Sequence, residues 1–285
     1  MADLPILWRL RDFTRKLRAG ADAALRSEQL LRRIHQGQIL AEIAATPRFQ
    51  DPKRLLSAGY KVFSQNQEDG MIAEVFRRIG TASKRFVEFG VEDGLECNSA
   101  FLLTQGWSGA WIEGSQANAE KARAAFAAYQ VEVVGRYITV ENADQMISEL
   151  ARGEELDLLS IDIDTIDYWI WQAIRTVKPR LVVIEYNASW PPFIRKTVAN
   201  DPNMVWDGTN FSGASLGALA ALGREKGYAL VGCSLAGVNA FFVREDLVGD
   251  AFSAPFTAEN HYEPPRFDLA GSFGHRAGMG RWVDV

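Results

Sequence analysis

The chain has 285 residues and a formal net charge of −5, with 47% hydrophobic and 24% charged residues. This is ordinary globular composition with enough apolar residues for a sizeable core, and its acidic balance gives no push toward nucleic acid. Cys97 and Cys233 lie far apart without metal-ligand spacing, so neither a zinc site nor a disulfide framework is expected, which fits a reducing cytosol. No apolar run is long enough to predict a membrane span, and no cleavable signal is expected.

The first 58 residues are predicted to be a basic helical arm. Within residues 6–45, apolar side chains recur at spacings of three, four and seven: Leu10, Phe13, Leu17, Ala24, Leu31 and Ile34. Residues 1–35 hold eight basic and four acidic side chains, a charge of +4. Three interpretations stay open: an arm that dimerises, a helix resting on an anionic membrane surface, or a helix packed on its own domain.

Strands and helices then alternate, which predicts a doubly wound, mostly parallel sheet of seven strands. The expected strands are 84–91, 108–114, 131–139, 156–164, 179–187, 228–234 and 239–246, and the helices between them are 95–105, 117–129, 143–152, 167–176 and 213–228. The last two strands are separated only by LAGV, which allows an antiparallel hairpin but no parallel crossover. This ending is typical of the Rossmann-like class I methyltransferases. We therefore assign a methyltransferase domain to 59–250 and an irregular tail to 251–285.

A turn with two glycines, EFGVEDG (88–94), follows the first strand of the sheet. Gly90 and Gly94 allow a tight turn and a close approach to a ligand. Glu92 occupies the place of a middle glycine, and with Asp93 it would repel a pyrophosphate. S-adenosylmethionine has no phosphate and carries positive charge, so the turn favours this cofactor.

Two further side chains are predicted to bind the nucleoside part of the cofactor. Glu113 ends the second strand, where a carboxylate can accept hydrogen bonds from both ribose hydroxyls. Asn142 follows the third strand and is placed to meet an adenine edge.

Acids crowd the ends of the fourth and fifth strands. Asp162 and Asp164 are two residues apart and share a face, and Glu185 and Asn187 repeat that spacing. Because ligands bind at the carboxyl ends of such strands, we expect one oxygen-rich site, with Mg²⁺ open as a second cofactor. Asp164 is predicted to be the base or a metal ligand, with Glu185 and Asn187 as further ligands and Asp162 supporting catalysis and cofactor binding. Asp167 is expected to start a helix.

A long irregular segment, 188–212, carries aromatic and basic side chains. Such segments are often lids or binding loops, and aromatic faces stack on sugar rings. Trp190, Arg195 and Trp206 are therefore predicted to bind the acceptor. The alternative is that the aromatic side chains only hold the loop on the core.

Roughly residues 60–250 resemble the FkbM-type, S-adenosylmethionine-dependent methyltransferases. The resemblance lies in FSQNQEDGMIAEVF (63–76), FVEFGVEDGLECNSAFL (86–102), WIEGS (111–115), SIDIDTIDYWIWQAI (160–174), VVIEYN (182–187) and GASLGALAALGREKGYALVGCSLAGVNAFFVRED (213–246). It implies that Glu88, Gly90 and Asn98 line the methionine end of the cofactor and that Glu113 binds the ribose. It also implies that Gln65, Glu68 and Asp69 lie nearby on a preceding helix. The chain departs from the family at Glu92 and at Thr165-Ile166, where a Gly-Asn pair is expected.

The leading hypothesis is an O-methyltransferase acting on a sugar, glycan or glycolipid hydroxyl. The alternative is a non-catalytic module that binds the cofactor or a glycan. A nucleic-acid methyltransferase is disfavoured because no basic stripe and no Asn/Asp-Pro-Pro-Tyr-like motif is present. The expected location is the cytoplasm, with peripheral membrane contact or homo-oligomerisation through the arm as open alternatives.

Overall fold

The structure is a computed structural model that describes residues 4–270, 278 and 279. The chain divides into two compact units, Met1–Thr46 and Pro47–Val285. This division falls before residue 58, the end of the arm that the sequence suggested. None of the helices in the described part combines the length and hydrophobicity needed to cross a membrane.

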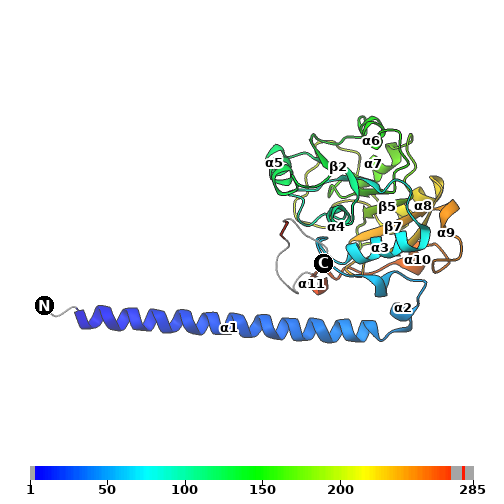
Figure 1. The fold of residues 1–285 in the computed structure, drawn as a ribbon. Helices are drawn as coiled ribbons and strands as arrows, with labels where there is room; N and C mark the ends of the chain where they lie inside the picture. Colours follow the sequence, from blue (N-terminus) through cyan, green and yellow to red (C-terminus); the bar gives the residue numbers. More distant parts are fainter. Residues whose placement is uncertain (1–3, 271–277, 280–285) are drawn as a thin grey trace. The chain divides into compact units, whose positions relative to one another are not determined.

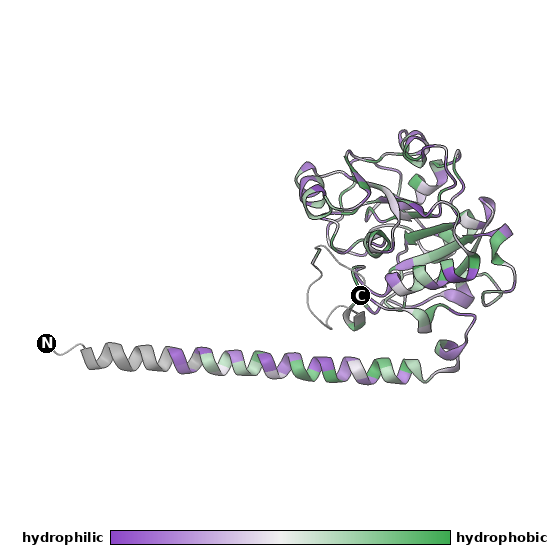
Figure 2. Ribbon diagram, viewed as in Figure 1, coloured by the Kyte–Doolittle hydropathy of each residue, from purple (hydrophilic) through white to green (hydrophobic). Residues whose placement is uncertain are grey.

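The first unit is one long helix, α1 (Leu4–Ala44), as the apolar spacing predicts. From Arg18 to His35 every described side chain is exposed, and hydrophilic and hydrophobic residues follow one another along the helix (Figure 2). Leu10, Phe13 and Leu17 of the predicted apolar pattern lie outside the described side chains.

The second unit contains the sheet, of which Figure 1 labels β2, β5 and β7. The sheet has seven strands in the order β3-β2-β1-β4-β5-β7-β6. The strands are β1 (Arg85–Phe89), β2 (Ser108–Glu113), β3 (Val131–Gly135), β4 (Leu158–Ile161), β5 (Leu181–Glu185), β6 (Tyr228–Cys233) and β7 (Asn239–Arg244). The first five run parallel, and β7 pairs antiparallel with both β5 and β6. The predicted fold class, a mostly parallel sheet ending in an antiparallel hairpin and preceded by an N-terminal helix, is confirmed.

Helices cover both faces of the sheet, because the central strands are apolar on both sides. One apolar core lies between the sheet and α6 (Ala143–Ala151), α7 (Asp167–Ala173) and α8 (Leu216–Glu225). The other lies between the sheet and α3 (Glu68–Ile79), α4 (Ala100–Thr104) and α5 (Gln116–Ala125). In β1, Phe86 faces the second core while Val87 and Phe89 face the first, which is the alternation expected of a strand. Parallel strands with helices on both faces bring five carboxyl ends to one edge.

The segments flanking the sheet belong to the compact unit. These are α2 (Pro47–Gln50), the 3₁₀ turn η1 (Leu56–Ala58), α9 (Glu245–Val248), α10 (Ala258–His261) and α11 (Phe267–Ala270). The Arg48 guanidinium donates to Glu263 at 2.8 Å and to the Asn260 carbonyl at 2.7 Å, and Arg54 donates to the same carbonyl at 2.9 Å. Part of the tail expected to be irregular, 251–285, is therefore packed on the domain.

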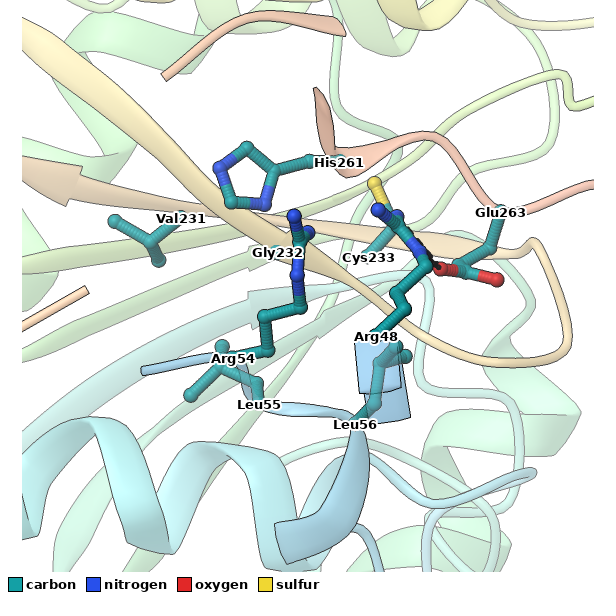
Figure 3. Close-up of a pocket in the computed structure, with 9 residues that line it drawn as sticks. All are labelled: Arg48, Arg54, Leu55, Leu56, Val231, Gly232, Cys233, His261 and Glu263. Atoms are coloured by element: carbon teal, nitrogen blue, oxygen red, sulfur yellow. Dashed lines mark hydrogen bonds and ion pairs between the residues drawn. The ribbon is translucent and has the colours of Figure 1, made fainter. Parts of the chain in front are cut away.

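Arg48, Arg54 and Glu263 also line a small hollow beside β6. The buried His261 lies near Arg54 in this hollow (Figure 3). Burial, followed by the charges of Arg54 and Arg48, lowers the pKa of His261 to about 4. None of the predicted site residues lines this hollow. The arginines serve to join residues 47–55 to the C-terminal segment.

The turn after β1 lies directly against the end of β4. Gly90 has a φ of +77°, and a Cβ built on it would lie 1.6 Å from the carbonyl oxygen of Asp162. The amide of Asp162 in turn donates to the carbonyl of Phe89 at 3.2 Å. Only glycine accommodates both the left-handed backbone and this approach.

We expect Gly90→Ala to lower the free energy of unfolding by more than about 3 kcal/mol, because a methyl group would collide with backbone in addition to straining φ. Gly153→Ala is the matched control, since Gly153 has a φ of +75° but a Cβ at that position would meet nothing within 4 Å. It should cost only about 1 kcal/mol. Urea denaturation of both variants measures the difference, and equal losses would contradict the proposed collision.

Candidate cofactor and acid site at the carboxyl edge of the sheet

Glu88, near the end of β1, is buried and anchors the turn that follows. Its carboxylate accepts hydrogen bonds from the amides of Asn98 at 2.8 Å and Ser99 at 2.9 Å, and from the Ser99 hydroxyl. Asn98 donates through its side chain to the Ser160 hydroxyl at 3.1 Å. Burial raises the pKa of Glu88, and these donors oppose the shift. The Glu88 carboxylate thus fixes the start of α4, beside the place where the methionine end of the cofactor was predicted.

Glu92, which stands where the fingerprint pattern would have a middle glycine, has a left-handed backbone conformation. Its φ is +49°, which is uncommon for a residue with a side chain and is found at functional sites. Its amide donates to Glu113 Oε2 at 2.8 Å, and the Ser115 amide donates to Glu113 Oε1 at 2.8 Å. Glu113 is therefore held at the end of β2 by two backbone donors, with the remaining lone pairs of each oxygen available to a ligand.

Three acids from two adjacent strands converge at the centre of this edge. Carboxylate oxygens of Asp162, Asp164 and Glu185 all lie within 4.8 Å of one another. Asp162 and Asp164 follow β4, and Glu185 ends β5, which pairs with β4 in parallel. Asp164 has a φ of +63°, so its backbone is strained into the left-handed region. Within the described residues, no hydrogen bond or ion pair joins these three carboxylates to another side chain.

The crowding makes the acids reluctant to ionise. Burial, then the charges of Glu185, Asp167 and Asp164, raise the pKa of Asp162 well above its usual range. Burial, then Asp167 and Asp164, raise the pKa of Glu185 to about 8. Partial burial raises the pKa of Asp164. Unpaired carboxylates at this spacing either share protons or hold a cation.

Asp167 starts α7, as the sequence predicts, and closes the turn after β4. Its Oδ1 accepts from the Ile163 amide at 2.9 Å, while the buried Oδ2 has no hydrogen-bond partner among the described residues. Burial raises the pKa of Asp167 to about 7. Thr165 and Ile166 have local functions, because the Thr165 carbonyl accepts from the Gly213 amide at 3.1 Å and Ile166 is buried in the core. The left-handed residue of this turn is Asp164 itself.

Asn187, predicted as a metal ligand, holds the loop that follows β5. Its side-chain amide donates to the carbonyls of Asn210 at 2.8 Å and Ser212 at 2.9 Å, and its oxygen accepts from the Ser189 amide at 3.1 Å. Its role as a metal ligand stays a prediction. Asp162, predicted to support catalysis and cofactor binding, is one of the three acids that converge.

Of the three residues predicted on the helix that precedes the sheet, Glu68 and Asp69 begin α3, whereas Gln65 lies in the loop before it. Gln65 is exposed, whereas Glu68 is buried and accepts from Asn239 Nδ2 at 3.1 Å. Asp69 Oδ2 accepts from the amides of Val62, Phe63 and Ser64 at 2.7, 2.7 and 3.0 Å. Asp69 therefore shapes the loop that precedes α3. Glu68 reaches the carboxyl edge through Asn239, which lies opposite Glu185 in the sheet.

Asn142 closes a turn after β3, and an aromatic side chain emerges from that turn. Asn142 accepts from the Thr139 amide at 2.8 Å and donates to the Tyr137 carbonyl at 3.0 Å. The Tyr137 ring lies over Gly114, where a Cβ would be 2.5 Å from the ring, yet 75% of the residue is exposed. The sequence analysis did not select Tyr137, since an aromatic residue after a strand has no distinctive spacing. Its place beside Glu113 makes it a candidate for stacking on a planar ligand.

The predicted acceptor residues lie on the loop after β5. Trp190 and Trp206 are 41% and 50% exposed, and Arg195 is exposed. The Trp206 indole donates to the Thr209 carbonyl at 2.7 Å, which holds its ring on the surface of the loop.

The carboxylates at this edge of the sheet favour positively charged ligands. Glu92 has Asp93, Glu113, Asp164 and Glu96 as charged neighbours, and burial followed by these charges raises its pKa. Phosphate groups would be repelled, whereas a sulfonium, an ammonium or a hard divalent ion would be attracted. Asp162, Asp164 and Glu185 provide the hard oxygen ligands that Mg²⁺ prefers.

No protein-family model and no curated protein matches the chain. Among solved structures, the N-terminal domain of EvdMO1, determined in the presence of SAH and D-fucose, is similar with 15% identity and a TM-score of 0.41, covering 62% of this chain and 80% of that one. A putative caffeoyl-CoA O-methyltransferase from Staphylococcus aureus is similar with 16% identity and a TM-score of 0.44, covering 76% and 99%. The mitomycin 7-O-methyltransferase MmcR has 18% identity and a TM-score of 0.35, covering 61% and 54%.

The raised pKa of Glu185 predicts that stability falls with rising pH. Between about pH 4.5, the value for the unfolded chain, and about pH 8, the folded state keeps a proton that the unfolded state has lost. Glu185→Gln should therefore raise Tm by roughly 3–10 °C at pH 8.5 and change it little at pH 4.5.

The control is Glu120→Gln, which removes the same charge from an exposed position of α5. Thermal melts of the wild type and both variants across this pH range measure the effect. Parallel curves for the wild type and Glu185→Gln would contradict the crowding of unpaired carboxylates.

Proposed function

We propose that the chain is an S-adenosylmethionine-dependent O-methyltransferase that acts on a sugar, glycan or glycolipid hydroxyl, as the resemblance to the FkbM-type enzymes suggests. The observation that carries the proposal is the convergence of Asp162, Asp164 and Glu185, within 4.8 Å of one another, beside the Gly90 turn. In a doubly wound sheet, this edge is where ligands bind.

The cofactor would lie along the turn after β1, with its ribose at Glu113 and its adenine ring on Tyr137. Glu113 is fixed by the amides of Glu92 and Ser115 at 2.8 Å each, so its orientation is set before a ligand arrives. Gly90 keeps the turn free of a side chain, and the surrounding carboxylates favour a positively charged ligand.

The bound cofactor supplies an electrophilic methyl group with a thioether as the leaving group. The chain must hold the acceptor hydroxyl in line with the carbon–sulfur bond, exclude water and receive the hydroxyl proton. We assign the proton to an Asp164 carboxylate oxygen, because Asp164 is the most exposed of the three acids and its raised pKa makes it a stronger base. Asp162 and Glu185 would stabilise the positive charge that develops on the attacking oxygen before its proton leaves.

A divalent ion such as Mg²⁺ fits the same three carboxylates. It would neutralise their repulsion, lower the pKa of an acceptor hydroxyl and fix a vicinal diol. The acceptor would then meet the loop after β5, where Trp190 and Trp206 offer aromatic faces and Arg195 offers a positive charge.

We expect Asp164→Asn to bind S-adenosylhomocysteine within about threefold of the wild type but to lose at least 100-fold in turnover, since a missing general base costs about 10²–10⁴-fold. Asp250→Asn, at an exposed position after α9, is the control. Turnover is followed by S-adenosylhomocysteine release with a panel of methyl glycosides, with and without Mg²⁺. Cofactor binding with no turnover on any acceptor would favour the non-catalytic module.

Glu113→Gln and Tyr137→Ala should each weaken S-adenosylhomocysteine binding about tenfold, while Tyr137→Phe keeps the ring and binds normally. Glu120→Gln is again the control. Isothermal titration calorimetry with S-adenosylhomocysteine and with adenosine measures these affinities. Absence of heat with the wild type would overturn the methyltransferase proposal, whereas unchanged affinity in Tyr137→Ala would remove only the stacking role.

A further inference from the structure

The charge of the chain is divided unevenly between its two parts. Residues 1–35 carry +4 while the whole chain carries −5, so the remaining residues carry −9, the difference between the two. Most of this positively charged segment lies in α1, and α1 belongs to the first of the two compact units. The helix therefore attracts negatively charged surfaces, whereas the net negative charge of the rest of the molecule repels them.

Five of the eight basic residues of α1 share one broad side of the helix. By their spacing, Arg11, Arg15, Arg18, Arg26 and Arg33 fall within a sector of about 80°. Of these five arginines, Arg15, Arg18, Arg26 and Arg33 have described side chains, and all four are exposed. One face of α1 therefore presents a row of positive charge to the solvent, interrupted by the exposed Asp22 between Arg18 and Arg26.

The opposite side of α1 is apolar and equally open to solvent. Leu31 and Ile34 are 67% and 49% exposed, and Leu30 beside them is 59% exposed. In the sequence, Leu10, Phe13, Leu17 and Ala24 continue this side toward the N-terminus. The separation has exceptions on both sides. Leu25 is 54% exposed and lies seven residues from Arg18 on the arginine side, whereas the spacing of Arg9, Lys16 and Glu28 puts them on the apolar side.

A second copy of the helix is a weaker partner for this apolar side. The two core series of the heptad pattern are apolar at both ends, but the middle of the seam consists of Gly20, Ala24 and Ser27, which contribute little apolar contact. Two helices of the same positive charge would also repel each other. Anionic lipid headgroups instead attract the arginines, while the acyl boundary accepts the leucines.

We propose that α1 binds the surface of an anionic lipid bilayer, with its apolar side at the acyl boundary and its arginines among the headgroups. The charge of the helix provides the attraction, and each arginine near the surface strengthens binding roughly fivefold. This proposal goes beyond the methyltransferase function and holds whether or not the chain is catalytic.

Flotation of the full-length protein with vesicles tests the proposal. The probes are vesicles of phosphatidylcholine alone and vesicles containing one part phosphatidylglycerol to about two parts phosphatidylcholine. We expect the protein to float with the anionic vesicles, to bind neutral ones more than tenfold more weakly, and to dissociate as salt is raised from about 50 to 500 mM. Absence of binding, or equal binding to both kinds of vesicle, would overturn the proposal.

Variants locate the contact. Arg18→Gln/Arg26→Gln/Arg33→Gln should weaken binding to anionic vesicles more than tenfold. Lys121→Gln/Arg175→Gln/Arg224→Gln, which removes the same charge from exposed positions of the compact unit, should leave it unchanged. If the two triple variants bind equally weakly, net charge rather than α1 is responsible and the proposal is wrong.

The apolar side is tested with Leu31→Ser/Ile34→Ser, which we expect to weaken vesicle binding at least fivefold. Circular dichroism of each variant checks that the helix persists. Sedimentation equilibrium without vesicles is the complementary measurement. A dimer that this double variant dissociates, in a protein that binds no vesicles, would assign the face to a second copy and overturn the proposal.

Discussion

The close contact between Gly90 and the Asp162 carbonyl determines the shape of the carboxyl edge. It brings the turn after β1 against the turn after β4, with no side chain between them. As a result, Glu113, which is held by the Glu92 amide, and the acids after β4 belong to one short stretch of this edge. A cofactor seated on the first turn would therefore meet the acids of the second.

The same contact concentrates like charge, and the chain supplies no cation to offset it among the described residues. Asp162, Asp164 and Glu185 face one another without a side-chain partner in this part of the chain, and Glu92 is surrounded by further acids. Glu92 and Asp164 also carry left-handed backbone strain. Charge repulsion and strain in one place reduce stability, and a cationic ligand relieves the repulsion. The charge distribution of this edge thus favours a positively charged ligand and reduces the stability of the free protein.

Other buried acids nearby have a different role, although they look similar in the sequence. Glu88 accepts three hydrogen bonds at the start of α4, and Asp69 accepts three backbone amides before α3. The hydrogen bonds from these donors offset the free-energy cost of burying the two carboxylates, which therefore organise the loops around the site. What distinguishes these acids from Asp162, Asp164 and Glu185 is the set of hydrogen-bond donors around each carboxylate, which residue type alone does not reveal.

The sequence by itself determined the order of strands and helices, the antiparallel ending and the long N-terminal helix, because these follow from local periodicity and short connections. It also placed Asp162, Asp164 and Glu185 at neighbouring strand ends, since strand direction decides where such residues meet. Only the tertiary structure decided that Asn187 binds the loop carbonyls, that Tyr137 lies on Gly114, and that residues 47–58 and the segment around Glu263 join the domain. Those outcomes depend on contacts between residues far apart in the chain, and such contacts leave no periodic signal in the sequence.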